Sequence, residues 1–326
     1  MDDRKVLGFD IGGTKIGIGL VTVEGKILGS RRIENKDTHP EDILPQLTEA
    51  AEAILHENQL AINDVEGFGI SAPGPADVAN GILTAPPNNK FWRNVPILQY
   101  LKDHLGIPGC FENDANCGAL AEGFFGAGRG IRDFIYLTMS TGIGGGIVTG
   151  GTLVRGTGFY GGEVGHTVLE IHNGRKCGCG MYGCYEAYCS GRNVALYLQD
   201  KLKNQPDHMI VQCAGGKVED IDMLALEKAF RAGDALAAEV WDEMALRNAQ
   251  AMGTLINTFN PRRLILGTLA WAIGDIYVEP IRQYLPRFCW PEMLKDCELV
   301  PSGLRREISA YAGAAAALYF LLHKTF

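Results

Sequence analysis

The sequence predicts an α/β fold with two domains. Short apolar runs of strand length alternate with longer segments in which apolar residues recur at helical spacing, and this alternation is typical of α/β proteins. The 326 residues are more than a single hydrophobic core usually organises. We expect a small N-terminal domain, residues 1–117 with about 305–326, and a larger C-terminal α/β domain, residues 118–304.

Three strands are expected at the start of the chain, followed by alternating helices and strands. The three strands are Val6–Ile11, Ile16–Val23 and Ile27–Ile33. Next we expect a helix from Pro40 to Asn58, a strand at Phe68–Ser71, a helix at Pro96–Leu105 and a strand at Gly109–Glu112. A further helix should begin at Asn113 or Asp114, because Asn and Asp are good N-caps and an Ala-rich run follows.

The second domain is expected to begin with a repeat of the opening pattern. Strands at Phe134–Met139 and Gly145–Thr149 enclose a turn of glycine and threonine, as the first two strands of the chain do. A glycine-rich, loop-dominated stretch follows up to Gly191. The remaining elements are expected to be helices at Arg192–Lys203, Ile221–Ala232, Asp234–Phe259 and Ser309–His323, and a strand at Arg263–Leu266.

Composition argues against two classes of function. The formal net charge is −8 and the chain has no basic run, whereas a nucleic-acid surface needs clustered Lys and Arg. No segment has the roughly 18–20 uninterrupted apolar residues of a membrane span. The Ala-rich stretch Ser309–Leu322 comes closest, but it is too short. We therefore expect neither a nucleic-acid partner nor insertion into a membrane.

The cysteines are expected to be reduced thiols of a cytoplasmic protein. Their number, nine, is odd, and three of them lie between Cys177 and Cys184, unlike the spread of a disulfide framework. Residues 5–11 already predict a buried strand, so we expect no cleavable signal peptide ahead of the fold.

A glycine-rich turn between the first two strands carries a carboxylate. The segment is Asp10-Ile11-Gly12-Gly13-Thr14-Lys15. Glycines let backbone N–H groups face an anion with no Cβ in the way, while Thr14 adds a hydroxyl and Lys15 a positive charge. Asp10 at a strand end is well placed to hold a metal ion through water, as phosphoryl transfer requires. A tight hairpin with an incidental Asp would give the same short pattern.

A second turn of the same kind follows the strand at residues 134–139. It reads Ser140-Thr141-Gly142-Ile143-Gly144-Gly145-Gly146. Two Thr/Gly turns at strand ends, one in each domain, predict a grip on a polyphosphate, although a flexible glycine hairpin remains the simpler interpretation of either turn alone.

A third motif places a carboxylate at the start of a helix. In Glu112-Asn113-Asp114-Ala115-Asn116, Asp114 could accept a proton from a hydroxyl as that hydroxyl attacks phosphorus. The helix N-terminus favours its ionised form, so it would be a weak base acting mainly by position. Asn and Asp at a helix start also serve simply as caps, and that interpretation stays open.

Metal ligands form the strongest local pattern in the chain. The run Cys177-Gly178-Cys179-Gly180-Met181-Tyr182-Gly183-Cys184 offers three thiolates. His166 would complete a tetrahedral set for zinc, although His172 lies nearer in sequence. A closed set of three Cys and one His leaves no position for water, so such a zinc ion would be structural.

Polar side chains suited to a polyol lie around these motifs. Glu163 and Glu186 can accept hydrogen bonds from pairs of hydroxyls, and Asn88, Asn89 and Asn113 can both donate and accept. Such a set favours a neutral, hydroxyl-rich ligand, although exposed carboxylates are also common on any surface.

Taken together, these segments resemble the ROK family of bacterial sugar kinases, repressors and uncharacterised open reading frames. The similarity runs through nearly the whole chain, and the Cys-Gly-Cys-Gly-x-x-Gly-Cys-x-Glu pattern is highly specific to the family. The motifs that carry it are Asp10–Lys15, Ser71-Ala72-Pro73-Gly74-Pro75, Asn113–Asn116, Thr141–Gly146, Glu163-Val164-Gly165-His166 and Cys177–Glu186.

The resemblance implies an actin-like ATPase (ribonuclease H-like) fold, with two lobes and a cleft between them. It implies that Asp114 is the catalytic base and that structural Zn²⁺ is bound by His166, Cys177, Cys179 and Cys184. The implied sugar contacts are Gly74, Asn88, Asn113, Asp114, Glu163, His166 and Glu186. The implied nucleotide contacts are Asp10, Gly12, Gly13, Thr14, Lys15, Thr141, Gly142 and Gly267.

The activity implied is ATP-dependent phosphorylation of a hexose, with Mg²⁺ accompanying the ATP and a homodimer as the expected assembly. The resemblance leans toward glucose, which would give glucose 6-phosphate. A kinase for N-acetylmannosamine, N-acetylglucosamine, fructose or allose is the nearest alternative, because the sequence does not place the side chains around the sugar's C2 position. A sugar-sensing repressor is less expected, because those members carry a helix-turn-helix segment and only nine residues precede Asp10.

Two departures from the family pattern concern the nucleotide. The family often has Gly-Gly after the late strand, where the adenosine packs, whereas this chain has Gly267-Thr268. Nucleotide affinity or base preference is therefore expected to differ. Ser140 stands where Gly is commoner, and since Ser keeps a donor, little effect is expected there.

Overall fold

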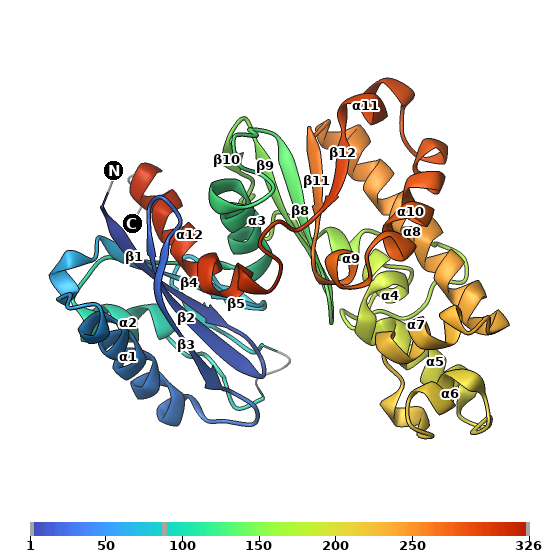
Figure 1. Ribbon diagram of the computed structural model, residues 1–326, viewed down its shortest axis with the longest axis horizontal. Helices are drawn as coiled ribbons and strands as arrows, with labels where there is room; N and C mark the ends of the chain where they lie inside the picture. Colours follow the sequence, from blue (N-terminus) through green and yellow to red (C-terminus); the bar gives the residue numbers. More distant parts are fainter. Residues whose placement is uncertain (1–2, 87–89, 324–326) are drawn as a thin grey trace. The chain divides into compact units, whose positions relative to one another are not determined.

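The computed structural model describes residues 3–86 and 90–323, and the chain divides into two compact units (Figure 1). Unit 1 comprises residues 1–132, 146–161 and 303–326; unit 2 comprises residues 133–145 and 162–302. The expected boundary at residue 117 falls inside helix α3 (Asp114–Phe125), which belongs to unit 1 as a whole. The chain also returns to unit 1 at residues 146–161, a crossing that the sequence did not indicate.

Unit 1 is built on a five-stranded sheet in the order β3-β2-β1-β4-β7. The strands are β1 (Lys5–Ile11), β2 (Lys15–Thr22), β3 (Ile27–Glu34), β4 (Gly67–Ala72) and β7 (Gly109–Asn113). β3, β2 and β1 are antiparallel neighbours, while β1, β4 and β7 are parallel. A small two-stranded sheet, β5 (Ala76–Asp77) with β6 (Ile82–Leu83), follows β4.

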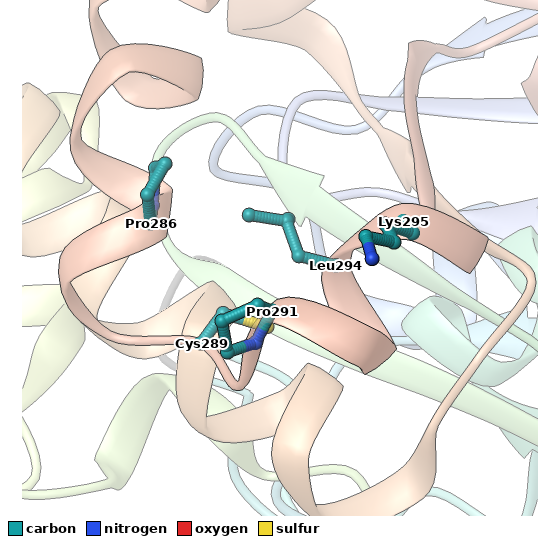
Figure 2. A pocket seen from close by; sticks show the side chains of 5 residues that line it. All are labelled: Pro286, Cys289, Pro291, Leu294 and Lys295. Carbon is teal, nitrogen blue, oxygen red and sulfur yellow. The ribbon is translucent and has the colours of Figure 1, made fainter.

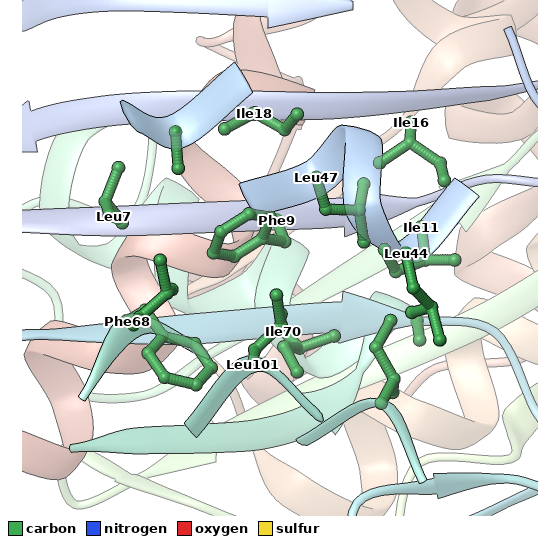
Figure 3. Packing of buried hydrophobic residues seen from close by; sticks show 14 of the residues in the cluster. Leu7, Phe9, Ile11, Ile16, Ile18, Leu44, Leu47, Phe68, Ile70 and Leu101 are labelled. Carbon is green, nitrogen blue, oxygen red and sulfur yellow. The ribbon is translucent and has the colours of Figure 1, made fainter. Parts of the chain in front are cut away.

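Successive side chains of a strand point to opposite faces of the sheet, so alternate residues of β1 lie on different sides. Leu7, Phe9 and Ile11 join a core with side chains of α1 (Pro40–Glu57) and α2 (Ile97–Leu105), as Figure 3 shows. Gly8, between them in sequence, faces the last helix, α12 (Ile308–His323), which packs on β1, β2, β4 and α3.

α12 lies so close to the sheet that only glycine fits at several contact points. A Cβ on Gly8 would overlap the backbone of Ala314, and one on Gly69 would overlap the backbone of Gly313. The Ala-rich run of the sequence is therefore a packing surface of small residues. No helix in the described part of the chain has both the length and the apolarity to cross a bilayer.

The second five-stranded sheet has the order β10-β9-β8-β11-β12. Its strands are β8 (Phe134–Met139), β9 (Ile143–Thr149), β10 (Thr152–Leu153), β11 (Arg263–Leu266) and β12 (Glu298–Pro301). β8, β11 and β12 are parallel. β9 begins in unit 2 and ends in unit 1, where β10 pairs with it.

Unit 2 contains most of the helices among the described residues. They are α4 (Tyr185–Cys189), α5 (Gly191–Leu202), α6 (Met209–Cys213), α7 (Met223–Arg231), α8 (Ala235–Phe259), α9 (Thr268–Ile273), α10 (Asp275–Tyr284) and α11 (Pro291–Asp296). Asp234 caps α8 by accepting a hydrogen bond from the N–H of Ala237, and the helix stops before Pro261. Met244 and Met252 of α8 are buried, so packing within unit 2 accounts for them.

Candidate active site and metal centre

Three polar side chains lie in one row across the parallel strands of unit 1. Asp10 of β1 is in register with Ser71 of β4, and Ser71 is in register with Glu112 of β7. Ser71 is buried, and its Oγ donates to Asp10 Oδ1 at 2.7 Å. Parallel strands end at the same edge of a sheet, so the residues that follow, among them Asn113 and Asp114, gather at that edge as well.

Asp10 and Asp114 act on each other electrostatically at this edge. Burial raises the pKa of Asp10 to about 7, the hydrogen bond from Ser71 lowers it, and the negative charge of Asp114 raises it further. Two carboxylates that repel each other at a strand end favour a hard divalent cation, which takes oxygen ligands. The residues present thus fit a Mg²⁺ ion bound together with a nucleotide.

The turn at Asp10–Lys15 is held by a residue that the sequence did not single out. The Gly12 N–H donates to the Lys15 carbonyl at 3.0 Å and closes the turn. Asn35 is buried beneath it: its Nδ2 donates to the Gly12 carbonyl and its N–H to the Thr14 carbonyl, each at 2.8 Å. Asn35 therefore fixes two carbonyl groups of the turn by hydrogen bonds.

Other predicted residues of the turn lie near its surface. Gly13 is partly exposed and Thr14 is exposed. The Lys15 ammonium lies 3.4 Å from a carboxylate oxygen of Glu34 on the neighbouring strand. In this conformation the charge of Lys15 is thus already paired at the surface, and its contribution to phosphate binding stays a prediction.

The sequence left open whether Asp114 caps the helix or acts as a base, and the positions of Asn113 and Asp114 bear on this. Asn113 is the N-cap of α3, since its Oδ1 accepts from the N–H groups of Ala115 at 2.9 Å and Asn116 at 3.4 Å. Asp114 is the first helical residue, is exposed, and has Oδ1 2.8 Å from the Ala115 nitrogen. Capping therefore rests chiefly on Asn113, which leaves the Asp114 carboxylate at the surface of the helix N-terminus.

Two further sugar-contact predictions fall close to β4. Gly74 follows the strand and is partly exposed, and a Cβ built on it would meet nothing within 4 Å. Asn88 lies outside the described residues.

In unit 2, the turn at Ser140–Gly142 is held by Glu186. Glu186 Oε2 accepts from the N–H of Ile143 at 2.9 Å. A Cβ on Gly142 would lie 2.8 Å from the same oxygen, so a side chain at that position would displace the carboxylate. The N–H of Gly267 donates to the Leu137 carbonyl at 2.8 Å, which places this predicted nucleotide contact beside the strand that leads into the turn.

The four predicted metal ligands are brought together in unit 2. Donor atoms of His166, Cys177, Cys179 and Cys184 all lie within 4.8 Å of one another. His166 Nδ1 is 3.8 Å from Cys177 Sγ, and the sulfurs of Cys179 and Cys184 are 3.7 Å apart. Among the described residues, this cluster includes His166 and not His172. Three sulfurs and one imidazole nitrogen are a donor set that suits tetrahedral zinc.

The metal cluster adjoins two of the predicted sugar-binding carboxylates. The other ring nitrogen of His166, Nε2, lies 3.9 Å from Glu163 Oε2. Glu186 Oε1 lies 3.8 Å from Cys177 Sγ. Burial raises the pKa of Glu163, His166 lowers it and the nearby charge of Glu186 raises it. His166 can therefore bind a metal through one nitrogen and a second ligand through the other.

A pocket elsewhere in unit 2 has a different character. It is a hollow of about 190 Å³ lined by Pro286, Cys289, Pro291, Leu294 and Lys295, as Figure 2 shows. Its lining is mainly apolar and includes none of the residues predicted to act on a sugar or a nucleotide.

Comparison with known proteins decides the family. Residues 6–319 match the ROK family over nearly the whole chain. The chain belongs to the ROK family. A glucokinase of Thermotoga maritima is 36% identical over 320 residues, which cover 97% of this chain and 98% of that protein.

Solved ROK structures share the fold. The ROK hexokinase of Thermus thermophilus has a TM-score of 0.81 at 30% identity, covering 98% of this chain and 99% of that one. A ROK glucokinase of Streptomyces griseus, solved with glucose and AMPPNP, has a TM-score of 0.77 at 31% identity, covering 96% and 98%. The expected actin-like ATPase fold of a ROK protein is thus confirmed.

Repressors of the same family are similar to this chain as well. A xylose repressor of Bacillus spizizenii is 29% identical over 306 residues, which cover 93% of this chain and 74% of that protein. The glucokinase and the ROK hexokinase match this chain over almost their whole length and support a hexokinase-type kinase, whereas the match to the repressor covers only part of that protein.

The Asp10 carboxyl gives a first prediction for this ROK protein. Because the pKa of Asp10 is raised from 3.8 to about 7, protonation favours the folded state, and stability is lost as the pH rises from about 4 to 7. We expect Asp10→Asn, which cannot ionise, to raise the free energy of unfolding by about 1–2 kcal/mol at pH 8. Near pH 4 the variant and the wild type should unfold alike.

Chemical denaturation without Mg²⁺ or nucleotide measures this difference at the two pH values. Asp77→Asn, at a partly exposed position of the short strand β5 in unit 1, is a control that should give the same small change at both. If Asp10→Asn changed the free energy of unfolding equally at pH 4 and pH 8, ionisation of Asp10 would not destabilise the folded state, and the prediction would be wrong.

Proposed function

We propose that this protein is an ATP-dependent kinase of hexoses, that its preferred substrate is glucose, and that Asp114 is its general base. The observation that carries the proposal is the exposed carboxylate of Asp114 at the N-terminus of α3, beyond the row of Asp10, Ser71 and Glu112, in a chain of the ROK family. A carboxylate so placed can accept the proton of a hydroxyl that attacks the outermost phosphorus of ATP.

The proposed nucleotide contacts come from the two Thr/Gly turns. In unit 1 they are Asp10 and residues Gly12, Gly13, Thr14 and Lys15, and in unit 2 they are Thr141, Gly142 and Gly267. Mg²⁺ bound with ATP would neutralise charge on the phosphates next to Asp10. Backbone N–H groups and hydroxyls of the turns then orient the phosphates rather than react with them.

The proposed sugar contacts are polar groups that suit neutral hydroxyls. Unit 1 supplies Gly74, Asn88, Asn113 and Asp114, and unit 2 supplies Glu163, His166 and Glu186. The proximity of Glu163 and Glu186 in unit 2 supports this assignment, since neighbouring carboxylates can each accept from hydroxyls of one sugar.

A structural zinc ion at His166, Cys177, Cys179 and Cys184 is part of the proposal. When bound, it supplies a rigid centre to the loop and no reactive water, because four protein ligands fill a tetrahedral set. By orienting His166 it would also fix the ring nitrogen that faces Glu163.

Location and assembly complete the proposal. The nine cysteines are free thiols in the structure, and this suits the cytoplasm, where we place the enzyme. We also propose a homodimer. Val168, Ile171 and Tyr182 of the metal-binding loop are exposed apolar side chains and support a self-association surface in unit 2.

The nearest alternative is a ROK kinase for another sugar, and a sugar-sensing repressor is the alternative from another class. Similarity to the xylose repressor favours the latter. The exposed Asp114 favours catalysis, because a sensor needs only to bind the sugar.

Asp114→Asn tests the base directly. The substitution keeps the shape of the side chain and leaves the Asn113 cap intact, but Asn cannot accept the proton. We expect kcat to fall by about 10²- to 10⁴-fold while sugar binding, measured by calorimetry, survives. Asp222→Asn is the matched control, since Asp222 caps α7 in unit 2 and Asn caps equally well. Turnover of Asp114→Asn within about twofold of wild type would remove Asp114 from the mechanism.

A panel of sugars and phosphoryl donors tests the substrate. We expect ADP release to be fastest, as kcat/KM, with glucose and ATP. N-acetylmannosamine, N-acetylglucosamine, fructose and allose are the competing acceptors, and polyphosphate is the competing donor. A higher value for another sugar would replace glucose in the proposal. Binding of a sugar without turnover of any acceptor would favour the repressor.

Zinc content tests the metal centre. We expect about one zinc per chain by elemental analysis of protein purified without chelator. Cys179→Ala should lose the metal and therefore have a lower melting temperature. Because Cys179 is exposed, its removal leaves no cavity in the core that could account for the change. Cys213→Ala, remote in sequence from the cluster, should keep it. Wild-type protein without zinc would contradict the assignment.

A further inference from the structure

Glu112 is a fully buried carboxylate whose partners surround the start of α3. It is 0% exposed, and its Oε1 accepts from the N–H of Asn113 and from Nδ2 of Asn116, each at 2.9 Å. Asn116 is itself 1% exposed. One carboxylate oxygen thus holds both the N-cap residue of α3 and the side chain of its third residue, on either side of Asp114.

The second oxygen of Glu112 is held by Arg155. Arg155 Nε donates to Glu112 Oε2 at 2.7 Å, and the arginine side chain is 22% exposed. Arg155 comes from the segment 146–161 that returns to unit 1 after the start of β9, 43 residues from Glu112 in sequence. The pair is therefore a long-range contact within one unit.

The Arg155 guanidinium is itself fixed in direction. Its centre lies 4.4 Å from the ring of Phe320 and 5.5 Å from that of Tyr319, both on α12. The Tyr319 hydroxyl accepts from the N–H of Leu153, two residues before Arg155, and the Gly161 N–H donates to the Arg155 carbonyl. Backbone and side chain of Arg155 are both tied to unit 1.

A buried carboxylate needs a charged partner of fixed geometry. Removing a carboxylate from water is costly unless a cation and further hydrogen bonds compensate it. A guanidinium is always charged, and the Arg155 Nε–H donates one directional, charge-assisted hydrogen bond to Glu112 Oε2, so Arg155 balances the charge of the carboxylate and fixes the position of that oxygen. Together with the two hydrogen bonds at Oε1, this contact orients the carboxylate toward Asn113 and Asn116.

We propose that Arg155 is a positioning residue for the reaction: through Glu112 it fixes the junction of β7 and α3, and hence the direction of the Asp114 carboxylate. The inference rests on the proposed function of Asp114 as general base. Arg155 itself touches neither substrate in this account. Its effect is on the geometry of the base, where displacements of about 1 Å in a reacting group cost rate rather than binding.

Arg155→Met is the principal test, since methionine fills similar apolar space between the rings without charge or hydrogen bonds. We expect kcat to fall about 10- to 100-fold, while KM for glucose and for ATP changes by less than about threefold. Arg155→Lys, which restores the charge but not the Nε–H donor in its fixed direction, should recover part of the loss. Arg263→Met is the matched control, because it breaks an arginine–glutamate pair between β11 and β12, and its kcat should equal that of wild type.

If Arg155 only stabilised the fold and had no effect on catalysis, the variants would behave differently. Arg155→Met would then have a lower melting temperature but an unchanged kcat per sugar-binding site, counted by calorimetry below that temperature. That result would overturn the proposal.

If Arg155→Met does not fold, Arg155→Met with Glu112→Gln removes both buried charges and keeps an oxygen at residue 112. We expect this pair to fold with a low kcat, and full recovery of kcat would overturn the proposal.

Hydrogen exchange separates this inference from the proposed function. In Arg155→Met, amides of residues 113–116 should exchange faster than in wild type, while Arg263→Met leaves them unchanged. Wild-type protein that phosphorylates no sugar would refute the proposed function. In that case unchanged exchange at residues 113–116 would overturn the inference, and faster exchange there would keep Arg155 as the residue that fixes the junction.

Discussion

The register of three parallel strands is the constraint on which the unit 1 site depends. Hydrogen bonding between β1, β4 and β7 aligns Asp10, Ser71 and Glu112 in one row. A shift by one residue would turn each of these side chains to the opposite face of the sheet. The register is fixed in turn by Leu7 and Phe9, which must enter the core on one face, and by the glycine contacts to α12 on the other.

Buried or half-buried polar side chains then fix the loops that follow the strands. Asn35 ties the carbonyls of the first turn, Glu112 ties the start of α3, and Glu186 ties the second turn while adjoining Cys177. Each satisfies backbone or side-chain donors that would otherwise be costly to bury. Loops built this way hold their shape before a ligand arrives, which lowers the ordering cost of binding. It also means that stability and activity share the same hydrogen bonds at these residues.

The sequence predicted what depends on near neighbours. β8 and β11 match their expected bounds, Asn113 caps α3, and the three cysteines with His166 cluster as expected, because each signal lies within a few residues or in a specific spacing. The region of α10, α11 and β12 was not predicted, because Pro280 interrupts the helical pattern of α10 and because α11 and β12 have only 6 and 4 residues. Arg155 and Asn35 were also missed: their partners lie 43 and 23 residues away, and an isolated Arg or Asn carries no local sign of such pairing.

The proposed base and the proposed nucleotide site share the carboxylates of unit 1. Asp10 and Asp114 repel each other when both are ionised, and the raised pKa of Asp10, due first to burial and partly to Asp114, reflects this. Under the proposed function, a nucleotide bound with its divalent cation would favour the ionised form of Asp10. By linkage, ionised Asp10 favours that complex by the same free energy. Arg155 compensates the charge of Glu112, the other carboxylate of the row, so that this buried group also has a partner. Three carboxylates near the ends of β1 and β7 and at the start of α3 are stable together only if each has its own cation or donor. In this chain Glu112 has Arg155, Asp10 has Ser71, and the exposed Asp114 stands at the positive end of α3.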